Sequence, residues 1–133
     1  MDFELTDEQK MIQEMAKNFT EKKIVPIASE IDKKDEFPRA LIKNMADLGL
    51  LGIPLPEEWG GAGCDVLSYV LALEEISKVS LAVAITVAVH TSLIAMPIYE
   101  YGSQKQKEKY LASLAKGEKL GAFCLTEPNV GSD

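Results

Sequence analysis

The residues with the clearest potential for chemistry lie in the last segment of the chain, TEPNVGSD. Pro128 and Asn129 favour a turn, and Gly131 permits a positive φ and the close approach of a ligand to the backbone. Thr126 and Ser132 place hydroxyl groups on either side of this turn. The free N–H groups between them could receive carbonyl or anionic oxygens, so the segment fits the edge of a cofactor site.

The same segment also fits an ordinary loop. Glu127 and Asp133 carry charges that repel an anion, which makes the turn a poor simple phosphate site. Turn chemistry by itself therefore leaves both interpretations open.

Metal and triad chemistry have little support elsewhere in the chain. His90 is the only histidine, which excludes a multi-histidine metal site and leaves little basis for a Ser-His-Asp triad. On an apolar helix it is interpreted as a satisfied core residue, with a pocket-lining role as the alternative. Cys64 and Cys124 lie 60 residues apart without a CxxC pair, so neither zinc nor a disulfide framework is indicated. We expect no metal site.

Two further features have a structural and a functional interpretation. Glu74 and Glu75 could suggest paired-carboxylate catalysis, but adjacent residues of a helix point about 100° apart and cannot face one substrate together. A helix with one solvated acid is the favoured interpretation. Trp59 could stack on a ligand, yet a structural anchor for its glycine-rich loop is favoured over that role.

Composition narrows the class of protein. The 133 residues are 47% hydrophobic and 26% charged, as expected for one globular domain. Fourteen lysines and arginines against 21 acids leave a net charge of -7, and Arg39 is the only arginine, so a nucleic-acid-binding face is not expected. The acidic start, MDFELTDEQK, does not resemble a secretory signal, and we expect a cytoplasmic location.

The elements that must position these residues are helices. TDEQ predicts a helix start at Thr6, Pro38 opens a second helix that stops at Gly49, and Asp65 caps a third after the proline- and glycine-rich loop 50–65. We expect the first helix to bury Met11, Ile12, Met15, Ala16 and Phe19. We expect the third helix to bury Val66, Leu67, Val70, Leu71, Leu73 and Ile76.

The most apolar stretch, residues 80–101, predicts a central helix. It is long enough to span a membrane, but Thr86, His90 and Pro97 interrupt it and no basic flank anchors it. We therefore expect a helix buried inside a bundle, with no membrane contact. Thr86, Val89 and Leu93 are candidates to line a pocket, but core packing explains them equally well, and they remain unassigned.

The character of the sequence changes after a short charged helix that ends at Gly117. In GAFCLT, apolar Phe123 and Leu125 alternate with residues of the other face, which predicts a strand. A lone strand needs a sheet, so we predict a helical domain over residues 1–120 and the start of a β-rich domain over 121–133. The fold class is all-α, a helical bundle followed by the first strand of a domain that this chain does not contain.

Several motifs in order resemble one enzyme family. FCLTEPNVGSD is similar to the flavin-binding signature of the acyl-CoA dehydrogenases, and LTEP followed by GSD is a specific match. LTDEQ, WGGAG, VLALEEISK, MPIYEYGSQKQKEKYL and GEKLGAF agree along the rest of the chain. The chain is identified as an N-terminal fragment of that family, closest in style to short-chain, butyryl-type bacterial members.

The resemblance implies an FAD-dependent enzyme that converts an acyl-CoA thioester to the trans-2-enoyl-CoA. It implies that Phe123 and Leu125 line the flavin edge and that Thr126 hydrogen-bonds the isoalloxazine ring. Gly131 and Ser132 would lie along the phosphate arm of the cofactor, and the Ser132 backbone would also meet the thioester substrate. Relatives also lead us to expect electron-transfer flavoprotein as electron acceptor and a homotetramer.

The same resemblance implies that no residue of this chain is the catalytic base. In the family the catalytic glutamate lies in the C-terminal domain, which would follow Asp133, so we expect the fragment alone to be inactive. Two alternatives stay open: an acyl-CoA oxidase or related flavoprotein of the same superfamily, and a non-catalytic helical interaction module.

Overall fold

The first helix begins where the capping motif predicts. The computed structural model describes residues 3–34 and 36–131. Helix α1 (Asp7–Phe19) is preceded by Thr6, whose side chain accepts the Gln9 N–H at 3.2 Å, while Gln9 Oε1 accepts the Thr6 N–H at 3.0 Å. This reciprocal capping box satisfies two N–H groups that the helix itself leaves free.

The chain then turns through two short segments before the second predicted helix. A π-helical turn, η1 (Thr20–Ile24), extends α1, and after Pro26 the chain forms α2 (Ala28–Lys34). Helix α3 (Arg39–Asp47) follows, with Pro38 just before its first residue. Gly49 ends this region at φ +75°, as its type predicts.

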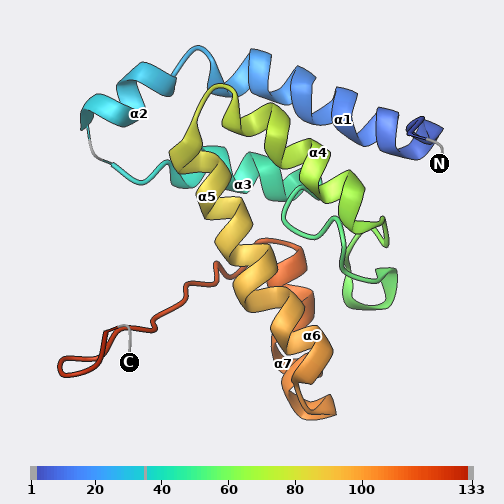
Figure 1. Ribbon diagram of the computed structural model, residues 1–133, viewed down its shortest axis with the longest axis vertical. Helices are drawn as coiled ribbons and strands as arrows, with labels where there is room; N and C mark the ends of the chain where they lie inside the picture. The colour runs from blue at the N-terminus through green and yellow to red at the C-terminus, as the bar shows by residue number, and fades with distance from the viewer. Residues whose placement is uncertain (1–2, 35, 132–133) are drawn as a thin grey trace.

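Helix α4 (Val66–Ser77) lies alongside α1 (Figure 1). The loop before it contains a 3-10 turn, η2 (Glu57–Trp59). Asp65 caps α4 by accepting the Ser68 N–H at 2.7 Å, and it also accepts a hydrogen bond from Gln9 Nε2 at 2.7 Å. These hydrogen bonds, led by the Ser68 N–H, hold the pKa of Asp65 below its usual range. One carboxylate thus links the start of α4 to the start of α1.

A single long helix runs from Leu81 to Tyr101 and is followed by α7 (Gln104–Ala115), which packs against its second half. It consists of α5 (Leu81–Ala88), a π-helical segment η3 (Val89–Ala95) and α6 (Met96–Tyr101). Among the described residues it is the one helix long and apolar enough to cross a membrane, and 33% of its apolar window is buried in the fold.

The central helix is not buried all round, contrary to the sequence-based expectation. Its inward face carries Val83, Ala84, Val87, His90, Thr91 and Ala95. Leu81 and Ile85 lie on the accessible face, 64% and 50% exposed. The described helices cover only one side of this helix, and its other apolar side has no cover from them.

The core consists of two hydrophobic clusters joined by the central helix. The larger cluster lies between α1, α3, α4 and α5 and includes Phe19, Ile24, Met45, Leu50, Ile76 and Val87. The smaller cluster lies between η3 and α7 and consists of Leu55, Ala95, Leu111, Leu114 and Ala115. Because α5 contributes to the first cluster and η3 to the second, the central helix sets the relative position of both.

Two predicted buried faces need correction. Met11 of α1 is 66% exposed, while Ala16 and Phe19 are buried as expected. In α4, Val66, Leu67 and Val70 are exposed, and Ser68 and Tyr69 are buried in their place. Apolar residues surround much of α4, so their spacing alone did not distinguish the side that packs against α1.

Gly49 and Gly117 both have positive φ, and a comparison of the two tests how closely the end of α7 packs against α3. Gly117 has φ +63°, and a Cβ there would lie 2.3 Å from Ala46 Cβ, whereas Gly49 has φ +75° and nothing within 4 Å. We expect Gly49→Ala to lower the free energy of unfolding by about 1 kcal/mol through backbone strain alone. Gly117→Ala should cost about 1–3 kcal/mol more, because α7 must move away from α3. Urea denaturation of both variants measures the difference, and equal losses would contradict this packing.

Candidate functional site

The segment that carries the predicted ligand-binding residues extends away from the helical body. After α7 the chain continues as an irregular tail, defined here as residues 121–131, which projects from the helices (Figure 1). Within the tail, the chain forms one hydrogen-bonded tight turn, over Pro128 and Asn129. The Glu127 N–H donates to Val130 O at 3.0 Å, and the Val130 N–H donates to Glu127 O at 3.2 Å.

The strand predicted to begin at Gly121 does not form. Within residues 3–34 and 36–131 the structure contains an isolated bridge in the tail but no β-strand. A strand is stable only when its backbone N–H and C=O groups pair with a neighbouring strand, and the segments beside the tail are helical. Alternation in GAFCLT is therefore not enough to produce a strand within this chain.

The tail exposes the side chains that the sequence selected. Phe123 and Leu125 are 52% and 73% exposed, and Thr126 is also exposed. Gly131 does not adopt a positive φ, but open space surrounds it, since a Cβ there would meet nothing within 4 Å. Ser132 lies outside the described residues. The described residues of the set thus share one exposed segment, without contacts that would organise them into a closed site.

A buried imidazole attaches the tail to the helices. His90 of η3 is fully buried, and its Nδ1 accepts the Gly121 N–H at 3.0 Å. Because Nδ1 is an acceptor, the proton lies on Nε2, which donates to Leu114 O at 3.1 Å. The sequence suggested a satisfied core histidine, and the structure confirms that both ring nitrogens have partners.

The π-helical segment directs two adjacent polar residues inward. Thr91 follows His90 and is also fully buried, with its hydroxyl donating to Leu51 O at 3.1 Å. Turns of this kind within α-helices are frequent at functional sites. Burial lowers the pKa of His90, and the Leu114 carbonyl opposes that shift in part. The imidazole is therefore held neutral in the tautomer that its two partners require.

The accessible side of the central helix has an apolar hollow near the start of the tail. Leu93, Pro97, Ile98, Tyr101 and Tyr110 are among the residues lining about 380 Å³ between this helix and α7. Leu93 is 44% exposed, which the alternative of core packing does not explain. Thr86 and Val89 are half-buried. This side of the helix can contact an apolar group, and the residues that line the hollow include no carboxylate, histidine or lysine.

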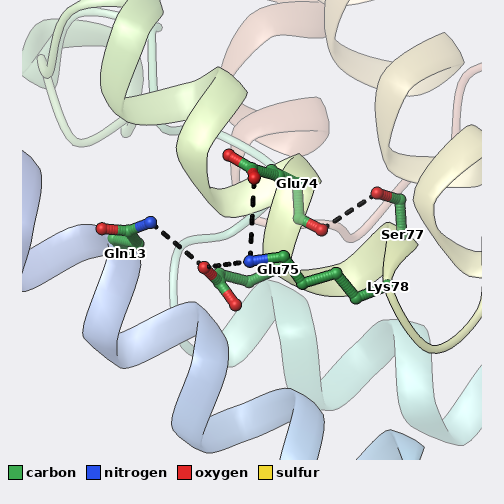
Figure 2. Close-up of polar contacts among 5 residues, drawn as sticks. All are labelled: Gln13, Glu74, Glu75, Ser77 and Lys78. Atoms are coloured by element: carbon green, nitrogen blue, oxygen red, sulfur yellow. Dashed lines mark hydrogen bonds and ion pairs between the residues drawn. The ribbon is translucent and has the colours of Figure 1, made fainter.

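The two adjacent glutamates have separate structural roles (Figure 2). Glu75 is buried, accepts a hydrogen bond from Gln13 Nε2 at 3.1 Å and pairs with Lys78 at 2.8 Å. Glu74 is exposed and lies 3.7 Å from the same lysine. The pair does not face a common cavity, as the 100° separation predicted, and Glu75 joins α4 to α1.

The other candidates from the sequence also have structural positions. Trp59 packs against the smaller hydrophobic cluster, which supports its interpretation as the anchor of the glycine-rich loop. Burial and the nearby carboxylates of Glu8, Asp65 and Glu57 raise the pKa of the half-buried Cys64 thiol, which disfavours a reactive thiolate.

Comparison with known proteins places these features in context. Residues 6–118 match the family described as acyl-CoA dehydrogenase, N-terminal domain. The chain is 51% identical to the short-chain specific acyl-CoA dehydrogenase of Clostridium acetobutylicum, over 100% of this chain and 35% of that protein.

Solved structures agree with the sequence comparison. A chain from the electron transferring flavoprotein structure of Acidaminococcus fermentans has a TM-score of 0.96 and 51% identity, with 99% of this chain and 35% of that chain covered. The acyl-CoA dehydrogenase of Bacillus anthracis complexed with FAD has a TM-score of 0.90 and 39% identity, with 98% and 23% covered. The chain thus spans about a third or less of the length of these relatives.

The two glutamates of Figure 2 are expected to differ in their effect on stability. Glu75→Ala removes the acceptor of the Gln13 amide and should lower the free energy of unfolding by about 1–3 kcal/mol. Glu74→Ala is the matched control, and as a surface change it should stay within about 0.5 kcal/mol of the wild type. Chemical denaturation compares them, and a larger loss for Glu74→Ala would contradict these roles.

The buried imidazole should make stability depend on pH. Its pKa is lowered in the folded state, so its contribution is present above about pH 6.5, the unfolded value, and is lost as the pH falls through the folded value. We expect the urea midpoint of the wild type to fall between about pH 7.5 and 5.5. His90→Asn removes the titrating group and should flatten this dependence, whereas an equal slope in both proteins would refute it.

Proposed function

Because this chain belongs to the acyl-CoA dehydrogenase family, we propose that it is the N-terminal part of a flavin-dependent enzyme that oxidises an acyl-CoA thioester to the trans-2-enoyl-CoA. The observation that carries the proposal is the match over residues 6–118 together with 51% identity to a short-chain specific member. The chain supplies helices and the first cofactor-binding segment of the whole protein. Residues 1–120 would form its helical domain and 121–133 the start of a β-domain.

The tail residues are suited to hold FAD. The exposed Phe123 and Leu125 would pack on the edge of the flavin, and Thr126 would hydrogen-bond the isoalloxazine through its hydroxyl or backbone. Open space around Gly131 leaves room for the phosphate arm. Ser132, predicted from the sequence, would contribute there and to the thioester. FAD, when bound, would accept the hydride from the β-carbon of the substrate.

The central helix is suited to contact the acyl chain. Leu93 is accessible beside the apolar hollow, and Thr86 and Val89 are half-buried on the same helix. An apolar wall of this kind excludes water from an alkyl group and binds it through burial of its surface. We therefore propose that this side of the helix forms part of the acyl-CoA site and that the catalytic glutamate comes from sequence following Asp133.

The proposed electron acceptor and assembly rest on the same family membership. Similarity to a chain in the structure of an electron transferring flavoprotein supports such a protein as the acceptor. We propose that the whole protein works in the cytoplasm as a homotetramer, and that this chain by itself is inactive because the base is outside it.

An absorbance spectrum of the whole protein that contains this chain tests the proposal. A flavin band between about 300 and 550 nm that bleaches on anaerobic addition of butyryl-CoA is the expected result. Absence of the band after reconstitution with FAD would overturn the cofactor assignment and favour a helical interaction module. A flavin band unchanged by butyryl-CoA would contradict a short-chain substrate.

Matched variants test the role of Thr126. Thr126→Val removes the hydroxyl at nearly constant volume and should weaken FAD binding about fivefold, the equivalent of one hydrogen bond of about 1 kcal/mol. Thr126→Ser keeps the hydroxyl and should stay within about twofold of the wild type. Titration of the apoprotein with FAD, followed by fluorescence, measures both. Equal affinities for the valine and serine variants would assign the contact to the backbone.

A further inference from the structure

The tail depends on a single polar attachment to the helices. Beyond Gly121, the hydrogen bonds of the described tail residues join Glu127 and Val130 to each other, and none reaches the helical body. Gly121 itself donates to His90 Nδ1 at 3.0 Å. The direction in which the tail leaves the body is therefore set at this residue.

One imidazole holds both ends of the turn that leads from α7 to the tail. Nε2 of His90 donates to Leu114 O, in the last turn of α7, and Nδ1 accepts from Gly121, seven residues later. Within this turn Gly117 takes its positive φ and its N–H donates to Leu114 O at 2.9 Å. The imidazole ring therefore bridges the two ends of this turn, Leu114 and Gly121.

Packing reinforces the same attachment. A Cβ on Gly121 would lie 2.6 Å from Cγ2 and 2.7 Å from Cβ of Ile94, so only glycine lets the backbone approach η3 this closely. Ile94 is four residues after His90, which places both on one side of the helix. The π-helical segment therefore meets the start of the tail with one polar and one apolar contact.

We propose that His90 is a positioning residue, which orients the flavin-binding tail by holding the Gly121 N–H against the central helix. The part of this inference that concerns flavin rests on the proposed function. The hydrogen bonds of His90 go to Leu114 and Gly121, so it acts on Leu125 and Thr126 through the backbone that starts at Gly121. An ordinary core histidine would stabilise the helices without affecting where these residues are held.

Two near-isosteric substitutions separate the two hydrogen bonds. Asparagine places its amide oxygen near the position of Nδ1 and can still accept from Gly121, but it does not reach Leu114. Glutamine reaches the position of Nε2 and can donate to Leu114 O, but it loses the acceptor for Gly121. The tail should therefore stay anchored in His90→Asn and be released in His90→Gln.

Amide hydrogen exchange at Gly121, measured by mass spectrometry on the whole protein, tests the anchor. We expect exchange at least about tenfold faster in His90→Gln than in the wild type, and within about threefold of the wild type in His90→Asn. Equal exchange rates in the two variants would overturn the proposal. If either variant fails to fold, Gly121→Ala replaces it. The added methyl should push residue 121 off Ile94 and accelerate its exchange, and unchanged exchange there would overturn the anchor.

FAD titration of the same proteins tests positioning. We expect affinity to fall about tenfold in His90→Gln and to be restored to within about threefold in His90→Asn. Faster exchange with unchanged FAD affinity in His90→Gln would overturn the positioning role. A wild-type protein without any flavin would instead refute the proposed function, while the exchange comparison would still decide whether His90 anchors the tail.

Discussion

The fold depends on one long helix, Leu81–Tyr101, whose two halves are buried in two different hydrophobic clusters. The first half of Leu81–Tyr101 packs against α4 and contributes to the hydrophobic cluster shared with α1 and α3, and the second half packs against α7. Polar His90 and Thr91 lie in η3, between α5 and α6, fully buried. Unpaired polar groups at such a position would be costly, but the carbonyls of Leu114 and Leu51 accept their hydrogen bonds. These two bonds tie the helix to α7 and to the loop after α3.

The pairing of α1 with α4 uses polar contacts at two levels. Gln9 and Asp65 join the starts of the two helices, while Gln13 and Glu75 join them farther along (Figure 2). Gln9 has a double task, because its oxygen completes the capping box as its nitrogen reaches Asp65. These polar contacts fix how the two helices are aligned along their lengths. Hydrophobic burial between the helices supplies the main stabilisation.

The uncovered side of the central helix and the extended tail are related features. Both present apolar side chains that the described helices do not bury, such as Ile85 and Leu93 on the helix and Leu125 on the tail. The chain covers about 35% of the short-chain relative that it matches, so in a protein of that length further sequence can cover this surface and this segment. In the proposed enzyme they border the acyl and flavin sites, which explains why neither is closed within the helical part.

The starts and ends of helices were predictable from the sequence, because each depends on residues within one helical turn. Thr6, Asp65, Gly49 and Gly117 cap or end helices as their types indicate. The family was also recognisable from short motifs, as the match over residues 6–118 confirms, whereas the roles of the flavin-signature residues stay a prediction. Only the tertiary structure decided which face of α4 is buried, because its apolar residues spread around the helix.

The tertiary structure also decided the role of His90 and the form of the tail. The partners of the histidine lie 24 and 31 residues away, and no local pattern encodes such distances. A strand at GAFCLT requires backbone partners from another segment, and the described helices supply none. Short-range interactions can be predicted from neighbouring residues in the sequence. Long-range hydrogen bonds and the choice of buried helix face form only when the helices pack together, so the sequence pattern alone does not reveal them.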